Sequence, residues 1–205
     1  MKQDQPKRKP GRPKATDSPQ TKGLIMRTAS FLFMEHGYEK VSLDSVAKAC
    51  SVTKASVYYY FSNKAALFTE SLQLVLKMAY EQTALIVYGP GTLQERLFEV
   101  AKKHMRNAHV DFETMMREAA SELSAEQVNA IRGSENTLHI LLAEVFQKAM
   151  DEKEINSSDP MLLSHVFIAT MSVRNRREIV NNAETVGQSA QEIVQLIWTG
   201  LAPRT

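Results

Sequence analysis

The sequence has 205 residues, a length that can bury a substantial hydrophobic core and allows one domain or two modest ones. Its 8 glycines and 7 prolines are few and gather near the N-terminus and at a few joints, so most of the chain can be helical. No apolar run reaches the roughly 18 residues of a membrane-spanning helix, and the basic N-terminus lacks the apolar stretch of a signal peptide. We therefore expect a cytoplasmic protein.

The net charge of +2 is unevenly distributed along the chain. Residues 1–14 carry six basic side chains against one acidic side chain, whereas acidic residues outnumber basic ones from residue 71 onward. A polyanion such as DNA would be attracted to the N-terminal end and repelled by the remainder.

Residues 1–17 are predicted to form a flexible basic arm, because they are rich in Lys, Arg, Pro and Gly and nearly free of large apolar side chains. The segment from Lys7 to Lys14 resembles an AT-hook, which lies extended in the minor groove of A·T-rich DNA. This resemblance implies that Arg12 enters the groove, and we expect Arg12 and Lys14 to contact DNA. A solvated basic tail that attracts DNA by charge alone is equally consistent with these residues.

Three short helices are predicted to follow the arm. Ser18-Pro19 supplies an N-cap and a first-turn proline for a helix that continues to Gly37. Ser42 can cap a second helix and Thr53 a third. Because so few residues separate the second and third helices, the two must cross steeply, as in a helix-turn-helix.

A connecting helix and five further helices are predicted in the rest of the chain. Ser62-Asn63 can cap a long helix that runs to about Val87, and Gly89-Pro90-Gly91 breaks it. Nothing reads convincingly as a strand, so we predict an all-α fold of about nine helices. The last five predicted helices cover residues 92–108, 111–122, 125–152, 159–181 and 186–201.

Five short motifs occur in order between residues 21 and 70. They are Thr21-x-x-x-Ile25, Phe33-x-x-x-Gly37-Tyr38, Val46-Ala47, the run from Val52 to Phe61, and Asn63-Lys64-x-x-Leu67. In this order and spacing they resemble the DNA-binding head of the TetR (TetR/AcrR) family of transcriptional regulators. The chain departs from the family pattern at Ser51 and Ala55, where glycine is common.

The resemblance covers about a quarter of the chain, and it implies a function as well as a fold. It implies a ligand-responsive transcriptional repressor that binds a palindromic operator as a homodimer and is released when a small molecule fills its C-terminal part. We accordingly divide the chain into the arm (1–17), a helix-turn-helix DNA-binding domain (18–65) and an effector-binding and dimerisation domain (66–205).

The third predicted helix would enter the major groove, so its first turn would face base edges. Lys54, Ala55 and Ser56 lie on that turn and offer a long donor, a methyl group and a short hydroxyl. Ser42 and Thr53 begin the second and third helices, where hydroxyls and free N–H groups can bind phosphates.

The aromatic run at residues 58–61 allows two interpretations. By resemblance, Tyr58, Tyr60 and Lys64 contact phosphates, and Tyr59 contacts a thymine methyl group. The alternative is that the aromatic side chains fill the core of the head and that Lys64 is an ordinary surface lysine. Because four successive helical residues sweep the whole helix circumference, Tyr58 or Tyr59 must face outward.

The C-terminal part is predicted to mediate dimerisation. Residues 161–173 are apolar almost all round, as expected of a helix that meets its own core on one side and a partner on another. The resemblance implies that the last two helices of two copies form a four-helix interface. We assign this interface to Val166, Ala169, Val173, Ile193, Ile197 and Trp198.

Methionine and phenylalanine side chains of the C-terminal part could line an adaptable apolar cavity for a small lipophilic effector. Ordinary core packing is the alternative for any single one of them. Arg174, Arg176 and Arg177 could hold an acidic effector, but the negative C-terminal end of a helix also explains them. The candidate effector residues are Phe98, Met105, Phe112, Met115, Met116, Phe146, Phe167 and Met171.

Other classes of function find little support in the sequence. It contains no nucleophile-base motif and no phosphate-binding glycine loop, so we expect no catalysis. None of His104, His109, His139 and His165 has a second histidine or a cysteine at i, i+4 spacing, and we expect no metal and no cofactor. A DNA-binding architectural protein without sequence preference is the remaining alternative.

Overall fold

The computed structural model describes residues 19–106, 110–176 and 183–201. These residues form nine α-helices and one short 3₁₀ helix, and they contain no strand, which confirms the predicted all-α fold. The elements are α1 (Pro19–His36), α2 (Leu43–Ala49), α3 (Lys54–Tyr60), α4 (Lys64–Val87), α5 (Leu93–Met105), α6 (Phe112–Ala119), α7 (Ala125–Asp151), α8 (Pro160–Thr170), η1 (Met171–Asn175) and α9 (Ala183–Leu201).

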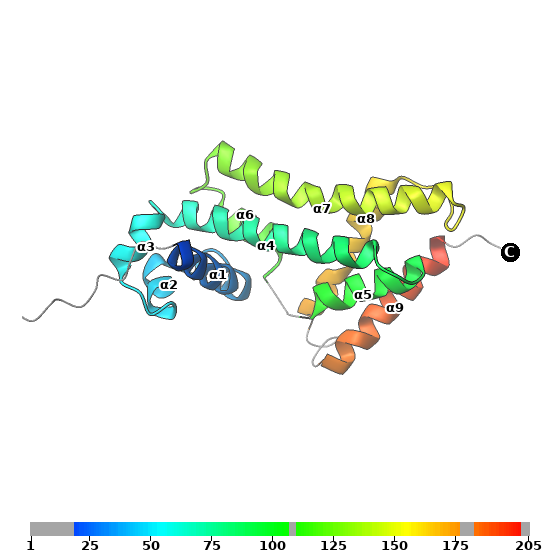
Figure 1. The fold of residues 1–205 in the computed structure, drawn as a ribbon, viewed down its shortest axis with the longest axis horizontal. Helices are drawn as coiled ribbons and strands as arrows, with labels where there is room; N and C mark the ends of the chain where they lie inside the picture. Colours follow the sequence, from blue (N-terminus) through cyan, green and yellow to red (C-terminus); the bar gives the residue numbers. More distant parts are fainter. Residues whose placement is uncertain (1–18, 107–109, 177–182, 202–205) are drawn as a thin grey trace, which may run out of the picture.

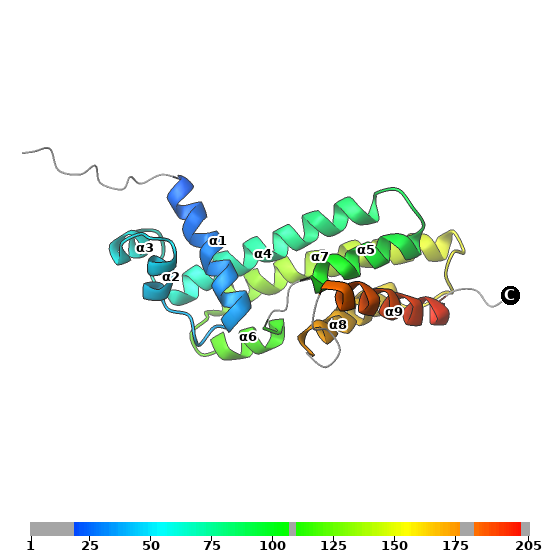
Figure 2. The ribbon, with the colours of Figure 1, turned by 90° about the horizontal axis from the view of Figure 1, so that it is seen from below.

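The helices form an elongated molecule with two ends (Figure 1). Helices α1, α2 and α3 lie at one end, which we call the head, and α5, α8 and α9 lie at the other (Figure 2). The long helices α4 and α7 run side by side between the two ends and connect them.

The starts of α2, α3 and α4 coincide with the predicted N-caps. The hydroxyl of Ser42 accepts a hydrogen bond from the Ser45 amide at 3.0 Å, and that of Thr53 accepts one from the Ser56 amide at 3.1 Å. The side-chain oxygen of Asn63 accepts one from the Ala66 amide at 2.8 Å. Each bond satisfies an amide that has no partner within its own helix, so these three predicted boundaries are confirmed.

Two hydrophobic clusters hold the molecule together. The first joins the buried faces of α1, α2, α3 and the start of α4 to side chains of α6 and the first half of α7, such as Met115 and Ile131. The second joins the far end of α4 to α5, α7, α8 and α9 around Phe146 and Phe167. The head therefore packs against α6 and α7 as well as α4.

Helix α8 ends earlier than the apolar pattern predicted. It stops at Thr170, and residues 171–175 tighten into the 3₁₀ helix η1. There the guanidinium of Arg174 donates a hydrogen bond to the backbone carbonyl of His104, near the C-terminus of α5. This contact gives a carbonyl at the C-terminus of α5 a hydrogen-bond partner. The apolar periodicity of residues 159–181 could not reveal a contact with a helix 70 residues away.

In the described part of the chain, no helix combines the length and the apolar character that crossing a membrane would require.

Candidate nucleic-acid interface

The turn between α2 and α3 is closed by a left-handed residue. Ser51 has a φ of 55°, and its amide donates to the Lys48 carbonyl while the Val52 amide donates to the Ala47 carbonyl. These two bonds form a Schellman motif, in which the left-handed position is usually glycine. The serine at this position therefore adopts the backbone conformation that glycine would adopt more easily.

The outer face of α3 is open to solvent. Thr53, Lys54 and Ala55 at its start are exposed, as are Tyr58 and Tyr59 one turn later, with 46% and 66% of their surfaces accessible. The opposite face buries Val57 completely in the first hydrophobic cluster. Helix α3 lies at the head end of the molecule (Figure 1), and two of its predicted base-reading residues, Lys54 and Ala55, are exposed there.

Lys54 is held by an acidic partner on α2. Its ammonium lies 2.8 and 2.9 Å from the two carboxylate oxygens of Asp44 and 5.6 Å from the centre of the Tyr58 ring. The hydrogen bond and charge of Asp44 raise the pKa of Lys54 above its usual value. The side chain is thus a cation at neutral pH, and a phosphate or base edge would have to compete with Asp44 for it.

A second short-range pair fixes the hydroxyls at the start of α3. The hydroxyls of Thr53 and Ser56 lie 2.8 Å apart, while Thr53 also caps the helix. Ser56 is partly buried, so its hydroxyl is less accessible than the side chains of Lys54 and Ala55.

The remaining aromatic and basic residues divide between surface and core. Tyr60 is partly buried and packs edge-on against the Tyr59 ring at 5.0 Å. Lys64 lies over the buried Tyr38 ring at 4.0 Å and donates to the Glu39 carbonyl at 3.4 Å. Tyr60 and Lys64 thus each have a contact within the protein and keep part of their surface in solvent.

The loop after α1 is clamped to α6 by a carboxylate. One oxygen of Glu118 accepts hydrogen bonds from the amides of Tyr38 and Glu39 at 2.7 and 3.2 Å. The Tyr38 hydroxyl donates to Glu122 at 2.8 Å, and burial together with this carboxylate raises the pKa of Tyr38 well above its usual value. Gly37 has a φ of 84°, and a Cβ there would lie 2.8 Å from Glu118. The clamp fixes the head relative to α6.

Two groups of predicted interface residues have different surroundings. On α8, Val166 and Ala169 are exposed, and Leu162 continues their face one turn earlier with 57% of its surface accessible. Val173 of η1 is partly buried. On α9, Ile193, Ile197 and Trp198 are partly buried against the second hydrophobic cluster, whereas Leu196 is 77% exposed.

The predicted effector residues do not gather in one place. Met115 and Met116 are buried in the first cluster with Phe112 packed against it, so these three contact the head. Met105, Phe146, Phe167 and Met171 are buried in the second cluster, and Phe98 packs on its edge. Phe98 alone of the eight also borders a groove of about 970 Å³, which is rimmed by basic side chains of α5 such as Lys102 and Lys103.

Sequence reasoning did not single out Asp44 and Glu118, which act at the head, or Leu162 on α8. Asp44 and Glu118 act on partners 10 and about 80 residues away, and nothing in their local patterns marks them. Leu162 could have been found, because it stands four residues before Val166 on the same helical face. Arg12 and Lys14, with the whole arm, lie outside the described residues.

Comparison with known proteins agrees with this geometry. Residues 25–70, which span α1 to the start of α4, match the profile of the family described as "Bacterial regulatory proteins, tetR family". The chain is 38% identical over 52 residues to the biofilm operon icaADBC HTH-type negative transcriptional regulator IcaR of Staphylococcus aureus strain Newman. This similarity covers 25% of the chain and spans 28% of the length of that relative.

Similarity in fold extends much further than similarity in sequence. The regulator FadR of Bacillus halodurans has a TM-score of 0.70 at 18% identity, with 92% of this chain and all of that chain covered. FadR of Bacillus subtilis, solved with stearoyl-CoA, has a TM-score of 0.67 at 16% identity over 87% and 98% of the two chains. AibR, solved with isovaleryl coenzyme A and operator DNA, has a TM-score of 0.65 at 21% identity over 86% and 97%.

Proposed function

Since the chain belongs, through residues 25–70, to the tetR family of bacterial regulatory proteins, we propose that it is a cytoplasmic, ligand-responsive transcriptional repressor. It binds a palindromic operator as a homodimer and leaves the operator when a small lipophilic effector binds residues 66–205. The name of the staphylococcal relative, a negative transcriptional regulator, supports repression over activation.

The observation that carries this proposal is the exposed face of α3. A short helix whose first turn projects Lys54 and Ala55 from the end of the molecule has the shape that the major groove accepts. Ser42 and Thr53 stand at the starts of two helices nearby and are assigned to phosphates, as are Tyr58, Tyr60 and Lys64. Ser56 completes the base-reading turn and Tyr59 is assigned to a thymine methyl group.

Residues outside the described part of the chain would add to this interface. Residues 1–17 form the arm in our proposal, and Arg12 and Lys14 supply further contacts to DNA. The six basic side chains before residue 15 match the charge of a polyanion.

Homodimerisation is proposed through α8, η1 and α9. The exposed apolar face of α8 would be covered by the same face of a second copy, as in an isologous interface. Two heads could then engage two half-sites about one helical turn of DNA apart. The proposed interface comprises Val166, Ala169, Val173, Ile193, Ile197 and Trp198, with Leu162 and Leu196 added.

The effector is proposed to bind within residues 66–205, which run from α4 to α9. Two proteins of similar fold were solved with acyl-CoA ligands, which supports the proposal that this chain binds a small molecule. The eight methionine and phenylalanine residues named above remain candidates for contacts with the effector, either in the second hydrophobic cluster or next to the head. We propose no catalytic residue.

Selection from randomised DNA with the purified full-length protein tests the proposal. We expect an enriched inverted repeat, and binding to it that exceeds binding to unrelated DNA by about a thousandfold or more at physiological salt. An architectural protein would enrich no common sequence and would bind both DNAs with similar affinity. Either of those two results would reject the repressor.

A further inference from the structure

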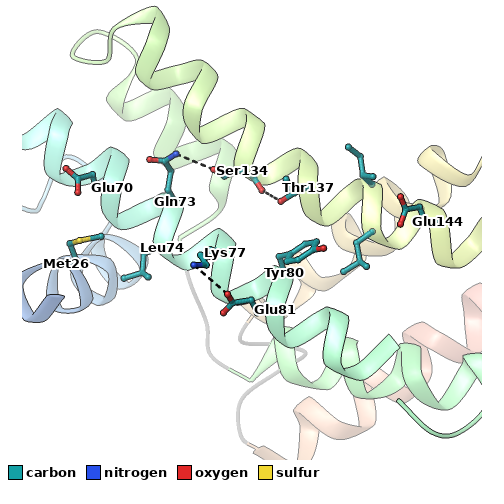
Figure 3. Close-up of a pocket in the computed structure, with 12 residues that line it drawn as sticks. Met26, Glu70, Gln73, Leu74, Lys77, Tyr80, Glu81, Ser134, Thr137 and Glu144 are labelled. Atoms are coloured by element: carbon teal, nitrogen blue, oxygen red, sulfur yellow. Dashed lines mark hydrogen bonds and ion pairs between the residues drawn. The ribbon is translucent and has the colours of Figure 1, made fainter. Parts of the chain in front are cut away.

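A groove runs along one side of α4 and α7 and reaches α1. It has a volume of about 780 Å³, within the range of small-molecule sites in proteins. Side chains from one face of α4 and one face of α7 form its two walls, and Met26 of α1 stands at the end nearest the head (Figure 3). An occupant would therefore touch the head and both long helices at once.

The floor and inner walls of the groove are apolar. Leu141 is buried at its base, and Leu74 and Met26 are partly buried. Ile140 and Tyr80 keep 42% and 37% of their surfaces accessible, with the Tyr80 ring directed toward α7 in Figure 3. A ligand that covered these side chains would gain hydrophobic free energy, and the Tyr80 ring would offer a π-face to a cation.

The rim of the groove is acidic. Glu70, Glu81 and Glu144 line it, against Lys77 as the basic lining residue. Glu70 is paired with Lys22 at 2.6 Å, and Glu81 has a long, exposed pair with Lys77 at 3.8 Å. Within the described residues, Glu144 has no basic group at ion-pair distance. An excess of carboxylates over an apolar floor is complementary to a positively charged apolar ligand.

The walls are joined at the head end of the groove. The Gln73 side chain of α4 donates to the Ala130 carbonyl at 3.5 Å and to the Ser134 hydroxyl at 3.4 Å, both on α7. Figure 3 draws the second of these long bonds, from Gln73 to Ser134, as the polar link between the two walls. A ligand wedged beyond them would change the spacing of α4 and α7 at little cost in hydrogen bonding.

We propose that this groove binds lipophilic cations and that a ligand of this class is the effector. The contrast with the groove beside Phe98 supports the assignment, since basic side chains outnumber acidic ones there, four to two, and favour the opposite charge. The inference has two halves. The binding half, that the groove binds lipophilic cations, is independent of the proposed function. The regulatory half, that such a cation is the effector, rests on the proposed function because it requires operator binding.

Calorimetry with tetraphenylphosphonium and tetraphenylborate tests the binding half, because these ions have nearly the same size and shape and opposite charge. We expect the full-length protein to bind the phosphonium. The double variant Glu81→Gln/Glu144→Gln should weaken phosphonium binding about tenfold, or about threefold for each carboxylate. The same variant should leave any borate binding unchanged, and Glu152→Gln, at the end of α7, is the matched control.

A second pair of variants tests the apolar wall without altering the carboxylates. Ile140→Lys places a cation in the groove and should abolish detectable phosphonium binding, whereas Ile140→Leu should preserve it. Phosphonium affinities that are equal in wild type, Glu81→Gln/Glu144→Gln and Ile140→Lys would overturn the proposal, as would no phosphonium binding to the wild type.

The regulatory half is read from the selected operator. Phosphonium should lower operator affinity at least tenfold in wild type and in Glu152→Gln, and should have no effect in Ile140→Lys. Groove-dependent phosphonium binding by a protein that selects no operator would reject the proposed function while keeping the ligand site. Operator binding that phosphonium leaves unchanged would reject the cation as effector while keeping the repressor.

Discussion

Lys54 lies at the start of α3, where it can bind either Asp44 or DNA. In the free protein its ammonium is bound by Asp44, and in a DNA complex it would face a base edge or a phosphate. We therefore expect Asp44 to lower the affinity of the protein for any DNA while it holds the lysine side chain in place. Changing Asp44 and changing Lys54 therefore test the proposed base-reading turn of α3 in two different ways.

Removing the acidic partner should strengthen DNA binding. We expect Asp44→Asn to raise affinity for operator and unrelated DNA alike by about threefold, because an exposed ion pair is weak and one negative charge leaves the DNA-facing surface. Fluorescence anisotropy over a salt series measures both affinities. A loss of affinity on this substitution would show that Asp44 is needed at the interface.

Removing the lysine should change which sequence is preferred. In selections from randomised DNA, Lys54→Ala should relax the preference at one or two base pairs of each half-site, whereas Lys64→Ala should weaken all sequences similarly. If Lys54→Ala lowers affinity and leaves the selected sequence unchanged, Lys54 is a phosphate contact and the assignment of the base-reading turn is wrong.

The turn between α2 and α3 contains a strained residue that can be relieved. Ser51 adopts a φ of 55°, which glycine adopts without a steric penalty. We expect Ser51→Gly to raise the free energy of unfolding by ~0.5–1 kcal/mol in urea denaturation, since the relief of strain exceeds the entropy that glycine adds to the unfolded chain. A matched change at exposed Ser157 should not stabilise the protein, and destabilisation by Ser51→Gly would contradict the left-handed assignment.

At the scale of the helices, local patterns predicted beginnings better than ends. The N-caps at Ser42, Thr53 and Asn63 follow from side chains that bond amides three residues ahead, so a short stretch of sequence contains the whole interaction. The end of α8 at Thr170 depends on Arg174 reaching His104, which is 70 residues away. The division of the predicted effector residues between two clusters has the same cause, because the packing partner of α6 is the head.

The Glu118 clamp is an interaction between elements that the sequence did not reveal. We expect Glu118→Ala to lower the free energy of unfolding by ~2 kcal/mol, because two amides lose a charge-assisted partner in a half-buried joint. The control Glu99→Ala removes an exposed carboxylate paired with Lys102 and should cost less than ~0.5 kcal/mol. Equal losses for the two variants in urea denaturation would argue against the clamp.

At the scale of the whole molecule, the exposed apolar face of α8 is the feature that a single copy leaves unexplained. Substituting Leu162→Glu together with Val166→Glu should convert a dimer to a monomer in light scattering at micromolar concentration, because two charges would enter an apolar interface. The control Leu85→Glu changes a leucine of α4 that is more exposed than Leu162 and should leave the dimer intact. A wild-type monomer under these conditions would contradict the proposed interface.

The two ends of the molecule depend on each other in this account, because the head reads DNA only when dimerisation presents two heads together. The sequence predicted the head well, since its motifs are local and closely spaced between residues 21 and 70. It could not place the proposed effector groove, because the groove between α4 and α7 is lined by side chains that stand about 60 residues apart in the sequence.

Sequence-specific DNA binding by the α3 face is the central claim, and one measurement tests it most directly. Anisotropy titrations at physiological salt should measure the affinity of the wild type and of Lys54→Ala for two DNAs, the selected inverted repeat and a scrambled repeat. We expect tight binding of the wild type to the inverted repeat, about a thousandfold weaker binding to the scrambled DNA, and a smaller difference between the two DNAs for Lys54→Ala. Equal affinity of the wild type for both DNAs would contradict it.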